Sequence, residues 1–256
     1  MEWIRLALRL SILIFVFPAF YLALLLGLFL FSFKKKLKIS WRNFIVQWWC
    51  RALVLILGIR VTVKGKPPET PFFLVSNHLG YIDIITYFTV LHCVFVSRHD
   101  LAQWPLFGLI ARSINTLFID RTRKMDIPRI NNQIDLAMQE NKGLIIFPEG
   151  TSTGGKDVLR FKPSLLEYAA KNRFPISYSS LHYETGVGDP PAHRSVCYWG
   201  DMHFVSHLFN LLKLSRVQAT IRFGPETIQS NDRKAIAQSA WEKIYDQFQP
   251  VYVDEK

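Results

Sequence analysis

Residues 75–84 read VSNHLGYIDI and place a histidine, His78, five positions before an aspartate, Asp83. The apolar run that leads into them, 72–76, is typical of a short buried strand, Gly80 indicates a turn, and the segment after the glycine has helical periodicity. On a single helix the two side chains would point about 140° apart, so they can meet only where the chain changes shape. The sequence therefore predicts that His78 ends a strand and that Asp83 lies in the first turn of a helix, where its carboxylate can orient the imidazole.

The same change from strand to helix recurs along the chain from residue 60 onward. This alternation is typical of the α/β class with a mainly parallel sheet flanked by helices. We therefore predict one α/β domain over 60–256 behind an N-terminal membrane-anchoring helical segment over 1–59. The expected strands are 60–64, 72–76, 93–97, 116–119, 143–148, 175–181, 194–199 and 217–223, and the expected helices are 82–92, 104–113, 126–140, 163–172, 201–213 and 231–247.

A long uncharged segment, residues 11–33, lies near the N-terminus and reads SILIFVFPAFYLALLLGLFLFSF. It is long enough to cross a bilayer core of about 30 Å. The segment runs directly into the basic stretch KKKLK without the small-residue cleavage site of a signal peptide. More lysines and arginines follow it than precede it, which places the following domain in the cytoplasm. We therefore expect an uncleaved anchor, and the short anchor is typical of a bacterial inner-membrane protein.

A second helix is expected at residues 41–59. Arg51 in the middle of this segment argues against a simple membrane span, and the tryptophans at 41, 48 and 49 are typical of a membrane interface. The pattern favours a helix that lies on the membrane surface beside the first one. A buried core helix with one polar edge is the alternative.

The charge and the composition indicate which partners the chain can have. The formal net charge is +11, which favours an anionic partner such as a lipid, a phosphorylated substrate or a nucleic acid. Half of the residues are hydrophobic and the mean hydropathy is +0.13, so the lipid is favoured and no nucleic acid is expected. The three cysteines form no CxxC pair, which predicts no disulfide framework. His203 and His207 have metal-ligand spacing, but they lack an H-E-x-x-H glutamate, so we assign them to the polar side of an amphipathic helix.

Two further polar clusters follow apolar runs. The stretch LFIDR, 117–121, ends in an arginine whose planar guanidinium suits a phosphate, although a surface ion pair would explain it equally well. The stretch GLIIFPEGTSTGGKD, 143–157, enters a loop whose backbone N–H groups could hold an anion. This loop is nearly a P-loop, but Asp157 occupies the place of the Ser or Thr that would bind magnesium, which argues against a nucleotide site.

With these three clusters in this order, the sequence resembles the glycerophospholipid acyltransferase family, which includes the 1-acyl-sn-glycerol-3-phosphate acyltransferases. The resemblance covers roughly residues 40–225, and the three motifs together are far more specific than any one of them. The family's N-H-x-x-x-x-D motif is matched by Asn77, His78 and Asp83, its F-x-x-R motif by Phe118 and Arg121, and its F-P-E-G-T motif by Phe147, Pro148, Glu149, Gly150 and Thr151.

The resemblance implies transfer of an acyl group from a thioester, acyl-CoA or acyl-carrier protein, to the hydroxyl of a lysophospholipid. An imidazole is mostly neutral at pH 7 and can act as a general base, so His78 would take the proton of the acceptor hydroxyl. Asp83 would fix the tautomer of His78. No metal, cofactor or covalent intermediate is expected. The substrate-binding residues implied by the resemblance are Asn77, Phe118, Arg121, Glu149, Gly150 and Thr151, with Arg121 on the phosphate.

The sequence departs from the family at Ser152, because many members have an arginine after E-G-T. This departure bears on which lysolipid is the acceptor, and it does not change the expected acyl-transfer reaction. We expect lysophosphatidate, which would give phosphatidate, with lyso-ornithine lipid or another lysolipid as the alternative. Two alternatives belong to a different functional class. One is a catalytically silent lipid-binding protein on the same fold, and the other is a thioesterase in which His78 activates water.

Overall fold

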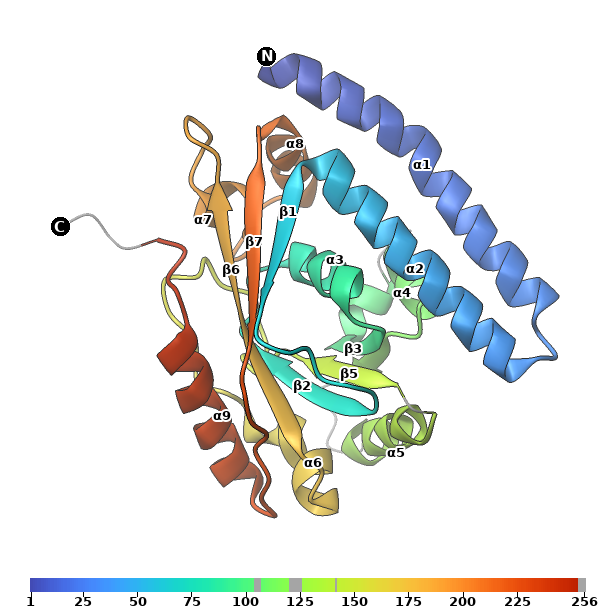
Figure 1. Cartoon of the computed structure of the whole chain (residues 1–256), viewed down its shortest axis with the longest axis vertical. Helices are drawn as coiled ribbons and strands as arrows, with labels where there is room; N and C mark the ends of the chain where they lie inside the picture. The colour runs from blue at the N-terminus through green and yellow to red at the C-terminus, as the bar shows by residue number, and fades with distance from the viewer. Residues whose placement is uncertain (104–106, 120–125, 141, 253–256) are drawn as a thin grey trace.

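A seven-stranded mixed sheet forms the centre of the computed structural model, which describes residues 1–103, 107–119, 126–140 and 142–252 (Figure 1). Within these residues the strand order is β1-β7-β6-β2-β5-β3-β4. All neighbouring strands are parallel except β6 and β7, which are antiparallel. The strands are β1 (Ile59–Lys64), β2 (Phe72–Ser76), β3 (Cys93–Arg98), β4 (Leu117–Ile119), β5 (Gly143–Ile146), β6 (Ile176–Thr185) and β7 (Val217–Phe223).

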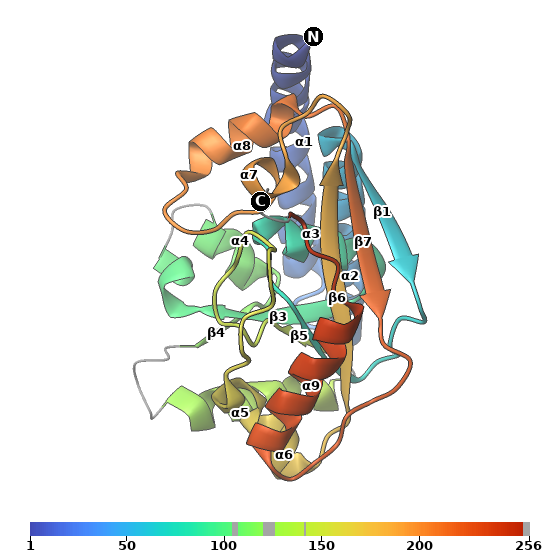
Figure 2. The ribbon, with the colours of Figure 1, turned by 90° about the vertical axis from the view of Figure 1, so that its left-hand side faces the viewer.

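Helices cover both faces of this sheet, so two apolar cores form, one on each side (Figures 1 and 2). One core lies beneath α2 (Lys35–Leu57), α3 (Tyr81–Val90) and α8 (Phe204–Lys213). The other lies beneath α5 (Asp126–Gln139), α6 (Glu167–Asn172) and α9 (Arg233–Gln247). The predicted α/β class with a mainly parallel, helix-flanked sheet is confirmed. The remaining elements are α1 (Glu2–Leu30), η1 (His99–Gln103), α4 (Phe107–Ser113), η2 (Pro163–Leu166) and α7 (Ala192–Ser195).

The strand predicted at 194–199 is wrong. The chain forms the short helix α7 there and then continues without regular structure until α8 begins. Val196 and Cys197 are fully buried in the core beneath α8, so their apolar character reflects tertiary packing. A short apolar run cannot by itself distinguish a strand from a buried irregular segment.

The helix predicted at 201–213 begins only at Phe204, and the two histidines near its start differ in their surroundings. His203 is exposed at the N-cap, whereas His207 is buried and contacts the Tyr81 hydroxyl through Nδ1 at 3.0 Å and the Cys197 carbonyl through Nε2 at 3.1 Å. The expectation that both lie on a polar side of the helix is therefore wrong for His207. Among the described residues, no group of three or more His, Cys, Asp or Glu side chains could hold a metal ion.

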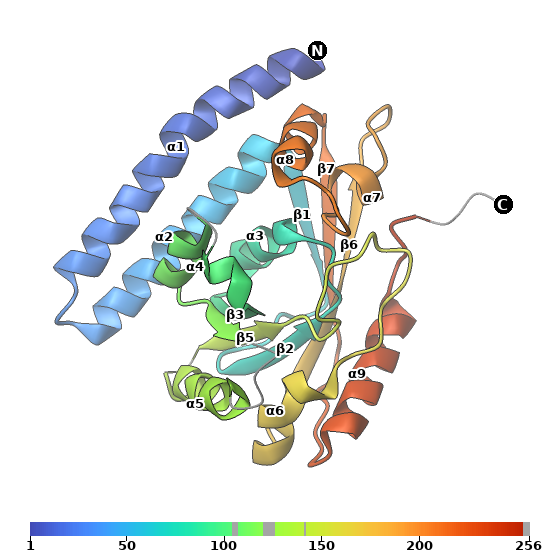
Figure 3. The ribbon, with the colours of Figure 1, turned by 180° about the vertical axis from the view of Figure 1, so that it is seen from behind.

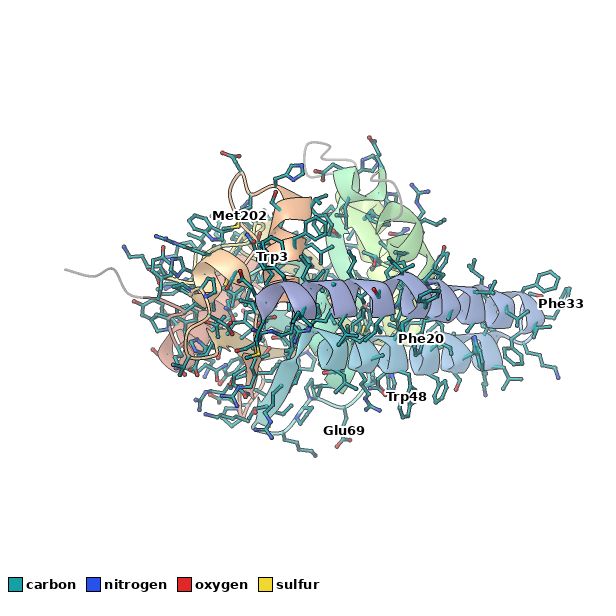
Figure 4. All side chains as sticks on the ribbon, turned by 90° about the horizontal axis from the view of Figure 1, so that it is seen from above. Trp3, Phe20, Phe33, Trp48, Glu69 and Met202 are labelled. Carbon is teal, nitrogen blue, oxygen red and sulfur yellow. The ribbon has the colours of Figure 1, made fainter. Side chains whose placement is uncertain are left out.

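The N-terminal segment forms two antiparallel helices, α1 and α2, that lie side by side (Figures 1 and 4). Both helices begin earlier in the sequence than predicted. Because α2 already begins at Lys35, only a short turn joins it to α1, at the end where Figure 4 labels Phe33. α2 packs against α3, and Arg9 of α1 donates to the Leu212 and Leu214 carbonyls at the end of α8, at 3.0 and 2.7 Å. Within the described residues, α1 is long and apolar enough to cross a membrane. The proposed division of the chain at residue 59 stays a prediction.

Candidate active site

β2 and α3 place His78 beside Asp83. β2 is buried throughout, and its direction carries the chain to His78 at the carboxyl end of the sheet. Gly80 then reverses the chain into α3 with a φ of +154°, and a Cβ at this position would lie 2.7 Å from the Tyr198 nitrogen. Asp83 is in the first turn of α3, and its Oδ2 lies 2.7 Å from His78 Nδ1. The predicted arrangement of a strand end and a helix start is therefore present.

Asp83 is held by four hydrogen bonds. Its Oδ2 accepts the backbone N–H groups of Leu79 at 2.6 Å and Gly80 at 3.0 Å, in addition to the imidazole. Its Oδ1 accepts the Tyr183 hydroxyl at 2.9 Å. The Asp83 side chain is fully buried, so these donors replace the water that a carboxylate needs. The carboxylate therefore has a fixed orientation toward His78.

His78 keeps one ring nitrogen available for chemistry. Because a carboxylate only accepts hydrogen bonds, Nδ1 carries the proton and Nε2 has a free lone pair. Within the described part of the chain, Nε2 has no hydrogen-bond partner. The side chain is 21% exposed, and its ring stacks on Phe147 with centroids 4.1 Å apart and planes at 8°. This geometry suits a general base that takes a proton from a ligand arriving from solvent.

Glu149 connects the site to the loop that follows β5. Its Oε1 accepts the His78 backbone N–H at 2.7 Å, and its Oε2 accepts the Leu159 backbone N–H at 2.9 Å. The residue is 2% exposed, and burial raises the pKa of its carboxyl to about 8 despite these two hydrogen bonds. Both carboxyl oxygens of Glu149 therefore accept hydrogen bonds from backbone N–H groups. The binding role that the sequence predicted for this residue stays a prediction.

The loop after Glu149, which Figure 3 shows as the yellow-green segment between β5 and α6, contacts the backbone of His78. The Thr153 N–H donates to the His78 carbonyl at 2.9 Å, and the Ser152 hydroxyl donates to the Tyr198 carbonyl at 2.6 Å. The Val251 N–H, from the segment after α9, donates to the Gly155 carbonyl at 2.7 Å. Gly150 has a φ of +77°, and the Thr151 side chain is exposed at the start of the loop.

Asn77 performs a structural task beside the site. Its Nδ2 donates to the Leu181 carbonyl at 3.0 Å, and its Oδ1 accepts the Leu181 N–H at 2.7 Å. The side-chain amide thereby extends the parallel pairing of β2 and β6 beyond Ser76, where the backbone register ends. Asn77 is 1% exposed, so its polar atoms are engaged inside the protein.

The second predicted cluster is only partly within the described residues. Phe118 lies half-buried on β4, and its carbonyl accepts a hydrogen bond from Arg129 at 2.6 Å. β4 is parallel to β3, and β5 lies between β3 and β2, so the carboxyl end of β4 faces the same edge of the sheet as His78. β4 is three strands away from β2 in the sheet, which corresponds to about 14 Å between the ends of the two strands. Arg121 lies outside the described residues.

Sequence reasoning missed Tyr183, although its strand was predicted from 175 onward. The structure extends this strand to Thr185, and residues 179, 181 and 183 share the face that looks toward α3. The alternation in SYSSLHYE was a sign of a strand, but nothing in it pointed to Asp83. Only the pairing of β6 with β2 brings Tyr183 to the site.

Comparison with known proteins identifies the family. The model of the Acyltransferase family matches residues 59–178, which include His78, Asp83 and Glu149. A lyso-ornithine lipid O-acyltransferase from Pseudomonas aeruginosa is 30% identical over 79% of this chain and 78% of its own length. The chain belongs to the acyltransferase family. The expectation that it is an O-acyltransferase is therefore confirmed at the level of the family.

Two further proteins show how far the acyltransferase resemblance extends. A lyso-ornithine lipid O-acyltransferase from Rhizobium meliloti is 31% identical over 72% of this chain, and the match spans 66% of that relative, slightly less than two thirds. The crystal structure of a 1-acyl-sn-glycerophosphate acyltransferase from Thermotoga maritima superposes with a TM-score of 0.66, covering 96% of this chain and 98% of that one. At 18% identity this likeness confirms the fold and carries no statement about the substrate.

Proposed function

We propose that this acyltransferase transfers a fatty acyl group from a thioester to the hydroxyl of a lysolipid, with His78 as general base. The observation that carries the proposal is the 2.7 Å contact between His78 Nδ1 and the buried Asp83 carboxylate, which leaves Nε2 as the proton acceptor. The family match supports the same reaction class. Either acyl-CoA or acyl-carrier protein would serve as the donor, and no metal or other cofactor takes part.

The proposed reaction needs one proton transfer in each direction. His78 Nε2 takes the proton of the acceptor hydroxyl as that oxygen attacks the thioester carbonyl carbon. The carbon–sulfur bond then breaks, and the proton on Nε2 passes to the leaving thiolate, which departs as a thiol. Asp83 stabilises the imidazolium that exists between the two transfers.

We propose lyso-ornithine lipid as the acceptor. The two sequence relatives above that are at least 30% identical carry this name, whereas the sequence alone had favoured lysophosphatidate. The loop chemistry agrees with a change of headgroup, because the residue after Thr151 is a serine whose hydroxyl donates to the Tyr198 carbonyl. A neutral hydroxyl engaged in this way is a poor substitute for an arginine on a phosphate.

The test compares purified protein in detergent with labelled acyl-CoA and, separately, labelled acyl-carrier protein. Lyso-ornithine lipid and lysophosphatidate are the two acceptors, and a reaction without acceptor measures released fatty acid. We expect diacyl product from lyso-ornithine lipid, and a loss of about 10²- to 10⁴-fold in His78→Ala. His203→Ala, which changes an exposed histidine at the start of α8, is the matched control and keeps its activity.

The other outcomes each contradict part of the proposal. Product from lysophosphatidate alone would contradict the acceptor and retain the chemistry. Fatty acid released equally with and without acceptor would identify a thioesterase. Full turnover in His78→Ala would contradict the general base, and no product with either donor would favour a silent lipid-binding protein.

We also propose that α1 anchors the protein in a bacterial inner membrane with the remaining chain on the cytoplasmic side. Most of α1 is apolar and exposed outside its contacts with α2 and α8, and lysines follow it at 34–36 and 38. Membrane fractions of producing cells would contain the protein, and spheroplasts would protect the domain from added protease. Cleavage of the domain in intact spheroplasts would contradict the orientation.

A further inference from the structure

Tyr183 is the feature of the candidate site that no sequence motif or family resemblance assigned. It lies on β6 with 1% exposure, and its hydroxyl is 2.9 Å from Asp83 Oδ1 and 3.2 Å from Thr86 Oγ1. A carboxylate accepts and does not donate, so Tyr183 donates to Asp83, and the Thr86 hydroxyl is left to donate to the Tyr183 oxygen. A chain of hydrogen bonds therefore runs from Thr86 through Tyr183 and Asp83 to His78.

We propose that Tyr183 is a positioning residue that keeps the Asp83 carboxylate oriented toward His78 and lowers the affinity of the His78–Asp83 pair for a proton. The inference rests on the proposed function, because it assigns to Tyr183 a role in setting the general base. Tyr183 does not touch the substrate in this scheme. It acts only through Asp83.

The positioning role follows from how the four donors are divided between the two carboxylate oxygens. Oδ2 accepts three hydrogen bonds, including the one from His78 Nδ1. Among the described residues, Oδ1 has Tyr183 as its one partner. Because the side chain is completely buried, no water can replace a lost donor. Without the Tyr183 hydroxyl, Oδ2 keeps its three hydrogen bonds, but the plane of the carboxylate is less firmly held, so the imidazole is less precisely oriented.

The tuning role follows from charge. A hydrogen bond to Oδ1 draws negative charge toward Tyr183 and away from the oxygen that faces His78. When this donor is removed, more charge faces the imidazole, and the pair holds a proton more firmly. The base is then neutral only at higher pH. The acid limb of the pH–rate profile should therefore move to higher pH.

The other ionisable groups around Asp83 stay in place when the Tyr183 hydroxyl is removed. Besides His78, charge interactions with Asp83 involve Glu149 from the loop after β5, Tyr87 from α3 and Cys197 from the segment after α7. Burial raises the pKa of the Cys197 thiol, which therefore stays neutral in the assay range. A shift of the profile in a Tyr183 variant thus reports the lost hydrogen bond.

The experiment measures kcat, the acceptor KM and the pH dependence of kcat/KM for wild type, Tyr183→Phe and Tyr87→Phe. Tyr87 is the matched control, because it is also fully buried between α3 and β6 and its hydroxyl contacts Ser76 and Ser179 at 2.7 and 2.8 Å. We expect Tyr183→Phe to lower kcat about 10- to 100-fold with little change in KM. Its acid limb should move upward by about half a pH unit or more, whereas Tyr87→Phe keeps the wild-type profile.

Three results decide the inference. An unchanged profile and kcat in Tyr183→Phe would overturn it, and so would equal losses in both phenylalanine variants without a shift. If Tyr183→Phe fails to fold, Thr86→Val removes the hydroxyl that donates to Tyr183 and should move the acid limb in the same direction by a smaller amount. An unshifted profile in Thr86→Val would then overturn the inference. An inactive wild-type protein with every acceptor would instead contradict the proposed function.

Discussion

The Glu149 carboxyl group and the His78 backbone are joined directly, because Glu149 Oε1 accepts the His78 N–H at 2.7 Å. The second oxygen of Glu149 binds the Leu159 N–H ten residues further along the chain. One buried side chain therefore fixes both the peptide that carries the candidate base and the closure of the loop beside it. This arrangement favours a supporting role over direct contact with the acceptor.

Glu149→Ala should lose both stability and turnover. The change leaves two backbone N–H groups without their acceptor, and each such group costs about 1–3 kcal/mol when buried. We expect thermal unfolding in detergent at a clearly lower temperature, and kcat at least about 10-fold lower with a nearly constant acceptor KM. Glu184→Ala, in which a 57% exposed side chain on β6 is removed, is the control. A selective rise in acceptor KM would show that Glu149 contacts the acceptor instead.

The ionisation of Glu149 should make stability depend on pH. Burial raises its pKa from an ordinary value of 4.5 to about 8 in the folded protein. Between these two values the unfolded chain loses the proton while the folded chain keeps it, so the free energy of unfolding falls as pH rises. Glu149→Gln cannot titrate. The unfolding temperature of the wild type should therefore fall relative to that of Glu149→Gln between pH 5 and pH 8.5. A constant difference between the two temperatures would contradict the raised pKa.

Asn77→Ala should separate a structural role from a substrate-binding role. The variant leaves the Leu181 N–H and carbonyl unpaired between β2 and β6, which should destabilise the fold by about 2–4 kcal/mol. Asn172→Ala, which removes one hydrogen bond at the exposed end of α6, is the control and should cost much less. Chemical unfolding measures both. If Asn77→Ala keeps its stability and raises the acceptor KM, the binding role predicted from the sequence holds.

Gly80→Ala should displace Asp83 from His78. The backbone has a positive φ of +154°, and the new Cβ would approach the Tyr198 nitrogen to 2.7 Å. We expect a destabilisation of about 1–3 kcal/mol and a loss of more than about 10-fold in kcat/KM. Gly188→Ala also has a positive φ, +83°, but its Cβ would meet nothing within 4 Å, so this variant should keep its activity. Equal activity in the two variants would show that the close approach to Tyr198 is unimportant.

Much of the fold follows from patterns that lie close together in the sequence. The strand-to-helix change around Gly80 predicted where His78 and Asp83 lie, because a buried strand, a turn residue and helical periodicity are all local signals. The alternation of apolar runs with helical patterns predicted the α/β class for the same reason. The apolar run at 194–199 was misread as a strand, because burial under α8 leaves the same composition.

The sequence by itself determined the α/β class, the pairing of His78 with Asp83 and the apolar character of the N-terminal segment. Each depends on residues within about one strand or helix of one another. Only the tertiary structure decided that both Glu149 oxygens bind backbone amides, that Asn77 joins β2 to β6, and that Tyr183 reaches Asp83. Three of these contacts join residues 71 to 104 positions apart in the chain, and the fourth, from Glu149 to Leu159, spans ten positions. Strand order, which no local pattern encodes, brings them together.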